Sequence, residues 1–235
     1  MKKLEKFLDN NIDTALMDDN KISQFEKYYE MLIEKNKVMN LTAITDRDEV
    51  ILKHFIDSVA LLRFHKLSDE KLIDVGTGAG FPGIPLKIVC PDIKVTLFDS
   101  LNKRVLFLRE VIDELGLKGI EAFHGRAEEG GQDKNMREGY DIAVSRAVAD
   151  MAVLSEYCLP FVRVGGYFIP YKTAEIDEEL NNAKKAVSTL GGKIEKVEKL
   201  DIEGNGRSFI FIKKEKPTPK AYPRKAGIAK KQPLK

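Results

Sequence analysis

The spacing of the hydrophobic residues changes near residue 70 of the chain. Before that point, apolar residues recur every three or four positions around residues 4–8, 22–33 and 46–64, which predicts three helices. Thr45 or Asp46 is the expected cap of the third helix. From Lys71 onward, short apolar runs alternate with helical patterns, so the pattern predicts strands and helices in alternation.

Seven short apolar runs qualify as strands. They lie at residues 72–75, 94–98, 120–124, 141–145, 167–169, 193–202 and 207–212. Helical patterns at 105–115, 150–162 and 174–190 separate several of them, which predicts βαβ units and a mostly parallel sheet. The last two runs meet at a tight turn, Glu203–Gly206, and are expected to form an antiparallel hairpin. The pattern therefore predicts an α/β fold, with a mostly parallel seven-stranded sheet preceded in the chain by N-terminal helices.

Composition excludes several classes of protein. The 235 residues are 43% hydrophobic and 32% charged, as in ordinary globular proteins, and no apolar run approaches the ~18 residues of a membrane span. The start, Met1–Glu5, has no signal-peptide core. Cys90 and Cys158 are far apart, which excludes a disulfide scaffold or a zinc ribbon. We expect a cytoplasmic protein without a bound metal or membrane contact.

Charge is distributed unevenly along the chain. Residues 213–235 hold nine Lys or Arg and one acid, whereas the preceding residues hold 30 bases and 36 acids. A basic, proline-containing tail on a mildly acidic body suggests a polyanionic partner, with nucleic acid the first candidate.

A glycine cluster follows the first predicted strand and precedes a helix. Residues 74–83 read Asp-Val-Gly-Thr-Gly-Ala-Gly-Phe-Pro-Gly. Glycines at positions 76, 78 and 80 remove the Cβ atoms that would keep a ligand away from the backbone. We therefore expect a ligand to lie over this loop, at the carboxyl ends of the parallel strands.

Two ligand patterns fit this cluster. Asp74-x-Gly76-x-Gly78-x-Gly80 is the form used for S-adenosylmethionine, whereas Gly78-x-Gly80-x-x-Gly83 satisfies the dinucleotide fingerprint. The second register starts four residues after the strand-end aspartate and contains a proline, so it is the weaker match. A nicotinamide-dependent dehydrogenase stays open as an alternative on this register.

Three further strand ends carry candidate binding groups. Asp99 ends the second strand, 19 residues after Gly80, where a carboxylate can accept both hydroxyls of a ribose. Residues 125–128 follow the third strand, where an adenine ring would lie. Arg146 ends the fourth strand, and an arginine at the end of a buried strand is costly unless it is paired.

Several motifs together resemble the ribosomal RNA small-subunit methyltransferase G family, also called the glucose-inhibited division protein B family. The motifs are Asn40–Ile44, His54–Ser58, Asp74–Pro85, Asn102–Arg104, Arg126–Glu129, Ser145–Ala147 and Tyr222–Gly227. The resemblance extends from about residue 40 to the end of the chain. The sequence departs from the family pattern at Thr173, where glycine is usual, and at Ala229, where proline is usual.

The resemblance implies a Rossmann-like methyltransferase sheet and transfer of a methyl group from S-adenosylmethionine to N7 of a guanine in 16S rRNA. The family's cofactor contacts correspond to Gly76, Phe81, Ala127, Glu128 and Arg146, and the glycine-loop and strand-end patterns add Gly78 and Asp99. The tail motif implies RNA contacts by Tyr222, Arg224 and Lys225. The expected partner is 16S rRNA or the small ribosomal subunit, bound by a monomer.

Guanine N7 holds a lone pair and no proton at neutral pH, so we expect no catalytic base among the three histidines. N7 lies on the major-groove edge, which side chains cannot reach in A-form RNA, so the target guanine should be unstacked. Phe81, Tyr171 and Phe168 are candidate stacking platforms, with Phe168 assigned to the core. Lys172, His54 and Asp57 are candidates for RNA contacts, with buried structural roles as the alternative.

These expectations divide the chain into a helical extension at residues 1–70, a methyltransferase domain at 71–213 and a basic tail at 214–235. A third functional reading also stays open. In it, the protein is an RNA-binding assembly factor of the ribosome without catalytic activity.

Overall fold

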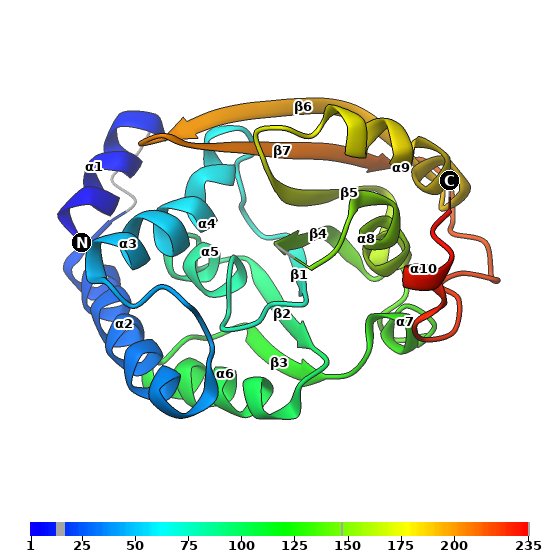
Figure 1. The fold of residues 1–235 in the computed structure, drawn as a ribbon. Coiled ribbons are helices and arrows are strands. Elements are labelled where there is room, and N and C mark those ends of the chain that lie inside the picture. The colour runs from blue at the N-terminus through cyan, green and yellow to red at the C-terminus, as the bar shows by residue number, and fades with distance from the viewer. Residues whose placement is uncertain (13–16, 147, 235) are drawn as a thin grey trace.

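A sheet of seven strands runs through the middle of the molecule (Figure 1), in a computed structural model that describes residues 1–12, 17–146 and 148–234. The strands are β1 (Lys71–Val75), β2 (Lys94–Asp99), β3 (Ile120–His124), β4 (Tyr140–Arg146), β5 (Val162–Thr173), β6 (Gly192–Ile202) and β7 (Asn205–Lys214). Their spatial order is β3-β2-β1-β4-β5-β7-β6.

The first five strands are parallel, and β7 is antiparallel to both β5 and β6. The predicted α/β sheet with a C-terminal hairpin is therefore confirmed. Pairing aligns the carboxyl ends: Val75 pairs with Phe98, and Asp99 pairs with His124. The loops after these strands consequently meet at one edge of the sheet, where ligands bind in open α/β folds.

Helices surround this sheet. They are α1 (Lys2–Asn11), α2 (Asp19–Met39), α3 (Arg47–Val50), α4 (Asp57–Val59), α5 (Gly83–Val89), α6 (Asn102–Glu114), α7 (Ala127–Gly130), α8 (Met151–Cys158), α9 (Asp177–Thr189) and α10 (Ile228–Lys231). A π-helical segment η1 (Ile51–Ile56) and the 3-10 turns η2 (Ala60–Arg63) and η3 (Leu159–Phe161) complete the set.

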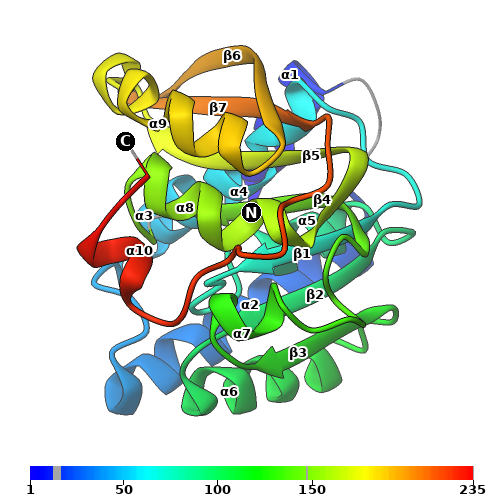
Figure 2. The same cartoon turned by 90° about the vertical axis from the view of Figure 1, so that its right-hand side faces the viewer.

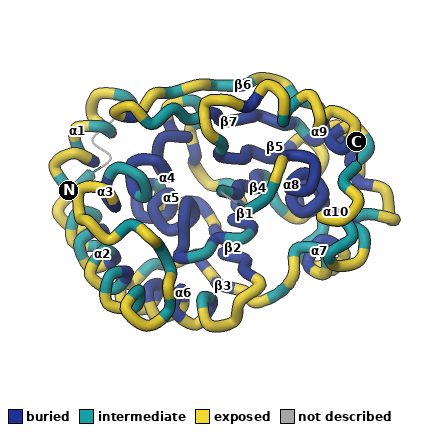
Figure 3. The backbone as a smooth tube through the Cα atoms, viewed as in Figure 1, coloured by how far each residue is buried: buried dark blue, intermediate teal, exposed yellow. Residues whose placement is uncertain are grey.

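Alternate residues of the central strands enter two separate hydrophobic clusters, one on each face of the sheet. On β1, Leu72 joins the cluster under α1, α2, α5 and α6, whereas Ile73 joins the cluster under α8 and α9. This division follows from the period of two along a strand. Figure 3 shows the buried strands at the centre and the exposed outer sides of α2 and α6.

The N-terminal helices belong to the first of these clusters. Phe25 and Tyr28 of α2 are fully buried, and the Tyr28 hydroxyl donates a hydrogen bond of 2.6 Å to the carbonyl of Ala79 in the glycine loop. Helix α2 ends before Asn40, where the backbone turns left-handed with φ of +50°. The helical extension thus braces the loop that follows β1.

Two predicted helices differ from those observed. The stretch 46–64 is not one α-helix, because α3 passes into η1, α4 and η2, although Asp46 caps it as expected by accepting from the amide of Glu49 at 3.0 Å. The predicted helix 150–162 ends earlier, at Cys158. Pro160 cannot supply the amide hydrogen that a continuing helix needs, and the chain enters β5 at Val162.

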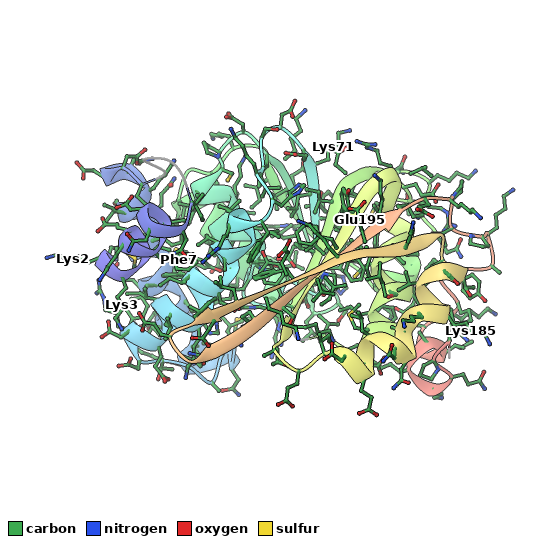
Figure 4. The ribbon with its side chains drawn as sticks, turned by 90° about the horizontal axis from the view of Figure 1, so that it is seen from above. Lys2, Lys3, Phe7, Lys71, Lys185 and Glu195 are labelled. Atoms are coloured by element: carbon green, nitrogen blue, oxygen red, sulfur yellow. The ribbon has the colours of Figure 1, made fainter. Side chains whose placement is uncertain are left out.

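The β6–β7 hairpin crosses the molecule from the side of α1 to the side of α9. Figure 4 shows it from above, running from the side of α1, where Lys3 and Phe7 are labelled, to the side of α9, where Lys185 is labelled. Lys3 lies 3.7 Å from Glu203 in the hairpin turn. Beyond β7, the remaining chain returns over α8 and α7 (Figure 2).

Candidate functional site

The glycine loop presents bare backbone to a cavity at one position. Gly78 has a φ of +65°, and a Cβ added there would meet no atom within 4 Å. Its amide donates to the Asp99 carboxylate at 2.9 Å, which ties the loop to the end of β2. Gly78 therefore leaves an open approach to the main chain, as the sequence predicted.

The neighbouring glycines serve other contacts. A Cβ on Gly80 would lie 2.6 Å from the Tyr28 hydroxyl, and one on Gly83 would lie 3.0 Å from an Asp74 oxygen. Both positions face the protein interior, so the expectation that Gly80 clears space for a ligand is wrong. Gly76 lies under Val148, whose Cγ2 would be 2.6 Å from an added Cβ.

Asp74 fixes the shape of this loop. Its Oδ2 accepts from the Thr77 hydroxyl at 2.7 Å and from the Gly83 amide at 2.8 Å, so the end of β1 is tied to the start of α5. The carboxyl group is fully buried, and this burial raises its pKa to about 6. Its Oδ1 has no hydrogen-bond partner among the described residues.

Asp99 lies beside Gly78 and lines a cavity of about 400 Å³. Its Oδ1 accepts from the Leu101 amide at 2.9 Å, and Arg104 lies 3.5 Å from Oδ2. A carboxylate has about four lone-pair sites, so these contacts leave room for further donors. The assignment of Asp99 to a ribose remains a prediction.

The seven predicted cofactor residues surround two adjoining cavities. The 400 Å³ cavity is lined by Gly76, Gly78, Phe81, Asp99 and Arg146, together with residues that include His54, Ser100 and Val148. A second cavity, of about 210 Å³, is lined by Gly76, Ala127 and Glu128, together with residues that include Ser100, Val148, Tyr157, Gly227 and Lys230. The fold therefore brings all seven residues to one edge of the sheet.

Arg146 is paired, as its position required. Its Nη1 donates to Asp57 at 2.6 Å and to the carbonyl of Lys53 at 3.1 Å. The other oxygen of Asp57 accepts from Nε of Arg207. Asp57 is 2% exposed, so one buried carboxylate pairs with two guanidinium groups.

His54 and Phe81 pack beside this arginine. The His54 ring stacks on Phe81 with centroids 4.7 Å apart, and the Arg146 guanidinium lies 5.1 Å from the Phe81 centroid. His54 Nε2 shares a hydrogen bond of 2.8 Å with the Thr42 hydroxyl. Burial, together with the positive charge of Arg146, lowers the pKa of His54 to about 4. The imidazole is therefore neutral at physiological pH.

A third cavity, of about 470 Å³, lies on the other side of Arg146 and His54. Residues that line it include Lys53, Asp57, Lys172, Glu179 and Arg207. Lys172 donates to Glu179 and to the carbonyl of Ala149, both at 2.6 Å. Sequence reasoning singled out neither Arg207 nor Glu179, because no motif marks them and only the folded sheet brings them to this place.

Two of the candidate stacking platforms are part of the core. Phe168 is fully buried, as assigned, and Tyr171 is 3% exposed with its hydroxyl bound to the carbonyl of Ser58 at 2.8 Å. Tyr171 is therefore largely enclosed, although it lines the third cavity, and its assignment as a stacking platform remains a prediction. Phe81 is also buried between aromatic neighbours, although it lines the larger cavity.

The predicted RNA contacts in the tail have different surroundings. Lys225 is exposed, and Tyr222 is half-buried. Arg224 forms an ion pair of 2.6 Å with Glu156, a residue of α8 that is 1% exposed. The guanidinium of Arg224 thus anchors the tail to the body, and its assignment to RNA remains a prediction. Ala147 of the Ser145–Ala147 motif lies outside the described residues.

The chemistry of the site fits a nucleoside cofactor. It combines a bare glycine backbone at Gly78 with a strand-end carboxylate at Asp99, both lining the larger cavity. Among residues 1–12, 17–146 and 148–234, no three His, Cys, Asp or Glu side chains gather as metal ligands would. Over the same ranges, no helix has the length and apolarity needed to cross a bilayer.

A sheet of this strand order, with a glycine loop after β1 and a carboxylate after β2, defines the class of Rossmann-like methyltransferases. A S-adenosylmethionine-dependent methyltransferase from Aquifex aeolicus has the same fold, with a TM-score of 0.54 and 19% identity. That match covers 77% of this chain and 97% of that chain.

Sequence relatives are much closer. The Desulforamulus reducens protein named ribosomal RNA small subunit methyltransferase G is 55% identical over 221 residues, covering 93% of this chain and 92% of that protein. A Clostridium botulinum (strain Loch Maree) protein of the same name is 52% identical over 230 residues, covering 97% and 95%. The family model described as rRNA small subunit methyltransferase G matches residues 21–209. The chain therefore belongs to the rRNA small subunit methyltransferase G family.

Proposed function

We propose that this protein transfers a methyl group from S-adenosylmethionine to N7 of a guanine in 16S rRNA. The observation that carries the proposal is the open backbone at Gly78, bound to Asp99, in a member of this methyltransferase family. The substrate is 16S rRNA or the small ribosomal subunit, and the protein acts as a cytoplasmic monomer.

The cofactor, when bound, supplies an electrophilic methyl carbon on a sulfonium. Gly76, Gly78 and Asp99 would hold its ribose and the adjoining chain, and Ala127 and Glu128 would hold its adenine end. Phe81 and Arg146 line the same larger cavity on the side away from Glu128. Bound over this loop, the cofactor would have its reactive end on the side of the larger cavity that Arg146 and His54 line.

The third cavity is suited to receive the guanine, because it shares Arg146 and His54 with the cofactor cavity. Lys172 and Arg207 line it with N–H donors, which match the O6 acceptor and the phosphates of a nucleotide. N7 has an in-plane lone pair and no proton to lose. The chain's task is to hold N7 in line with the methyl carbon, which in favourable cases lowers a barrier by up to ~7–11 kcal/mol.

No residue needs to act as a base in this reaction. His54 has a pKa of about 4, and Thr42 and the stacked Phe81 hold its ring in place. The residue is therefore suited to a positioning role and not to proton transfer. The product guanine carries a positive charge, and the carboxylates of Asp57 and Glu179 at the same cavity are already paired with Arg146, Arg207 and Lys172, so they offer it no free counter-charge.

The dehydrogenase alternative fails on geometry. Its glycine register requires the backbone at Gly80 to lie against the ligand, whereas a Cβ added to Gly80 would meet Ile84, Tyr28 and Leu108 in the interior. The alternative of a non-catalytic assembly factor has the same fold and makes a different prediction, namely RNA binding without methyl transfer.

The test is to incubate the protein with small subunits, or their 16S rRNA, from a strain that lacks the enzyme, together with cofactor carrying a labelled methyl group. We expect incorporation at a single guanine, and strand scission chemistry specific for 7-methylguanine should map it. Binding of the RNA without incorporation would support the assembly factor instead.

A further inference from the structure

The chain after β7 is packed against the body along much of its length. We call residues 215–234 the strap. Arg137, in the loop before β4, donates to the carbonyl of Tyr222 at 2.8 Å and to that of Thr218 at 2.6 Å. Gln132 donates to the carbonyl of Pro223 at 3.0 Å. Figure 2 shows the strap crossing in front of α7 and α8.

Buried charged groups hold the two ends of this contact. Lys214, at the root of the strap, is buried and donates to the Thr218 hydroxyl at 2.7 Å. Farther along, Glu156 accepts from the backbone amide of Arg224 at 2.8 Å and from its guanidinium at 2.6 Å. A buried carboxylate left without its partner is costly, so this ion pair favours the docked strap strongly.

The docked strap forms one wall of the smaller cofactor cavity. Gly227 and Lys230 line the 210 Å³ cavity together with Ala127 and Glu128. The amide of Gly227 donates to Oε1 of Glu128 at 3.1 Å. Ala229 is buried in the hydrophobic cluster under α8. The strap therefore reaches the residues expected at the adenine end of the cofactor.

Glu128 also faces the body. Tyr157 of α8 lines the same cavity, and burial together with the negative charge of Glu128 raises the pKa of the Tyr157 hydroxyl to about 12. Glu128 thus lies between α8 and the strap.

We propose that the strap is an integral part of the cofactor site, so that docking of the strap and binding of the cofactor nucleoside strengthen each other. The inference rests on the proposed function, because it assigns the smaller cavity to that nucleoside. The coupling is reciprocal by thermodynamic linkage: whatever the docked strap adds to cofactor affinity, the cofactor adds to strap docking. A strap that only carried positive charge for RNA would show no such coupling.

Two strap variants with the same change of charge test this proposal. Arg224→Gln cuts the ion pair with Glu156, whereas Lys220→Gln removes an exposed positive charge. Calorimetry with S-adenosylhomocysteine should show affinity weaker by about tenfold in Arg224→Gln, within the range usual for coupled sites, and unchanged in Lys220→Gln. Equal affinities in the two variants would overturn the proposal.

A measurement on the unaltered protein avoids any effect of a variant on folding. Limited trypsin digestion, followed by mass spectrometry, gives the rate of cleavage after the exposed Lys225. Saturating S-adenosylhomocysteine should slow this cleavage by roughly the same factor as the affinity change. If the compound binds and the cleavage rate stays the same, the strap is not coupled and the inference is wrong. If the compound does not bind at all, the proposed function itself fails.

Discussion

Replacing Asp57 by Asn removes the negative charge that two arginines share. The side chain of Asp57 is 3% exposed, and it accepts from Arg146 at 2.6 Å and from Arg207. Asparagine has the same shape and keeps one acceptor oxygen, so the variant creates no cavity. The change therefore isolates the electrostatic contribution of the carboxylate.

The expected loss of stability follows from the burial of the three groups. Removing one partner of a buried ion pair costs about 3–5 kcal/mol. The side chains of Arg146 and Arg207 are 16% and 22% exposed, so water retains some access to them and the lower limit applies. We expect Asp57→Asn to unfold with a free energy lower by about 3 kcal/mol, or a Tm lower by about 6–12 °C for a chain of this size.

Urea and thermal unfolding followed by circular dichroism measure this loss. Asp9→Asn, at an exposed carboxylate of α1, is the matched control and should leave the midpoint close to that of the original protein. The double variant Asp57→Asn/Arg207→Gln should recover part of the loss, because one unpaired guanidinium is gone. A Tm for Asp57→Asn equal to that of the control would refute the role of Asp57 as the shared counter-charge.

Three further outcomes follow from the site. Gly78→Asp should abolish binding of S-adenosylhomocysteine in calorimetry, because the new carboxylate enters the open cavity beside Asp99. Gly78→Ala should lower the free energy of unfolding by only about 1–2 kcal/mol, the strain of a left-handed backbone. Normal affinity in the aspartate variant would contradict the loop assignment. When the pH falls from 7 to 5, the original protein should lose about 2 kcal/mol of stability that His54→Gln does not lose. The reason is that unfolded His54 binds a proton near pH 6.5, whereas folded His54, with its pKa of about 4, does so only at lower pH. If urea unfolding shows the same difference in stability between the two proteins at both pH values, the prediction is wrong. The single-turnover rate of methyl transfer should be flat from pH 7 to 9, since Asp74, with its pKa of about 6, is already ionised there, and a bell-shaped profile would reveal a missed proton-transferring group.

The sequence predicted those features that depend on neighbouring residues. Short apolar runs in alternation with helical patterns predicted the sheet, and the turn at Glu203–Gly206 predicted the hairpin. The glycine cluster after β1 located the site, and the need to pair Arg146 was evident from its position at a strand end. Each of these inferences uses residues close together in the chain and the general geometry of helices and strands.

Features that depend on distant residues were not predicted. Asp57 and Arg207, 150 residues apart, meet only because β7 returns beside β5. The strap has little apolar surface of its own, and its docking depends on buried partners in α8 and before β4, such as Glu156. The inward direction of Gly80 depends on Tyr28 of α2, which no local pattern indicates.

The most direct test of the central claim is a crystal structure with S-adenosylhomocysteine bound. The compound should lie on the main chain at Gly78, with its ribose hydroxyls on Asp99 and its adenine between Ala127 and the strap. If it binds elsewhere on the protein, or leaves the backbone of Gly78 uncovered, the site assigned here is contradicted.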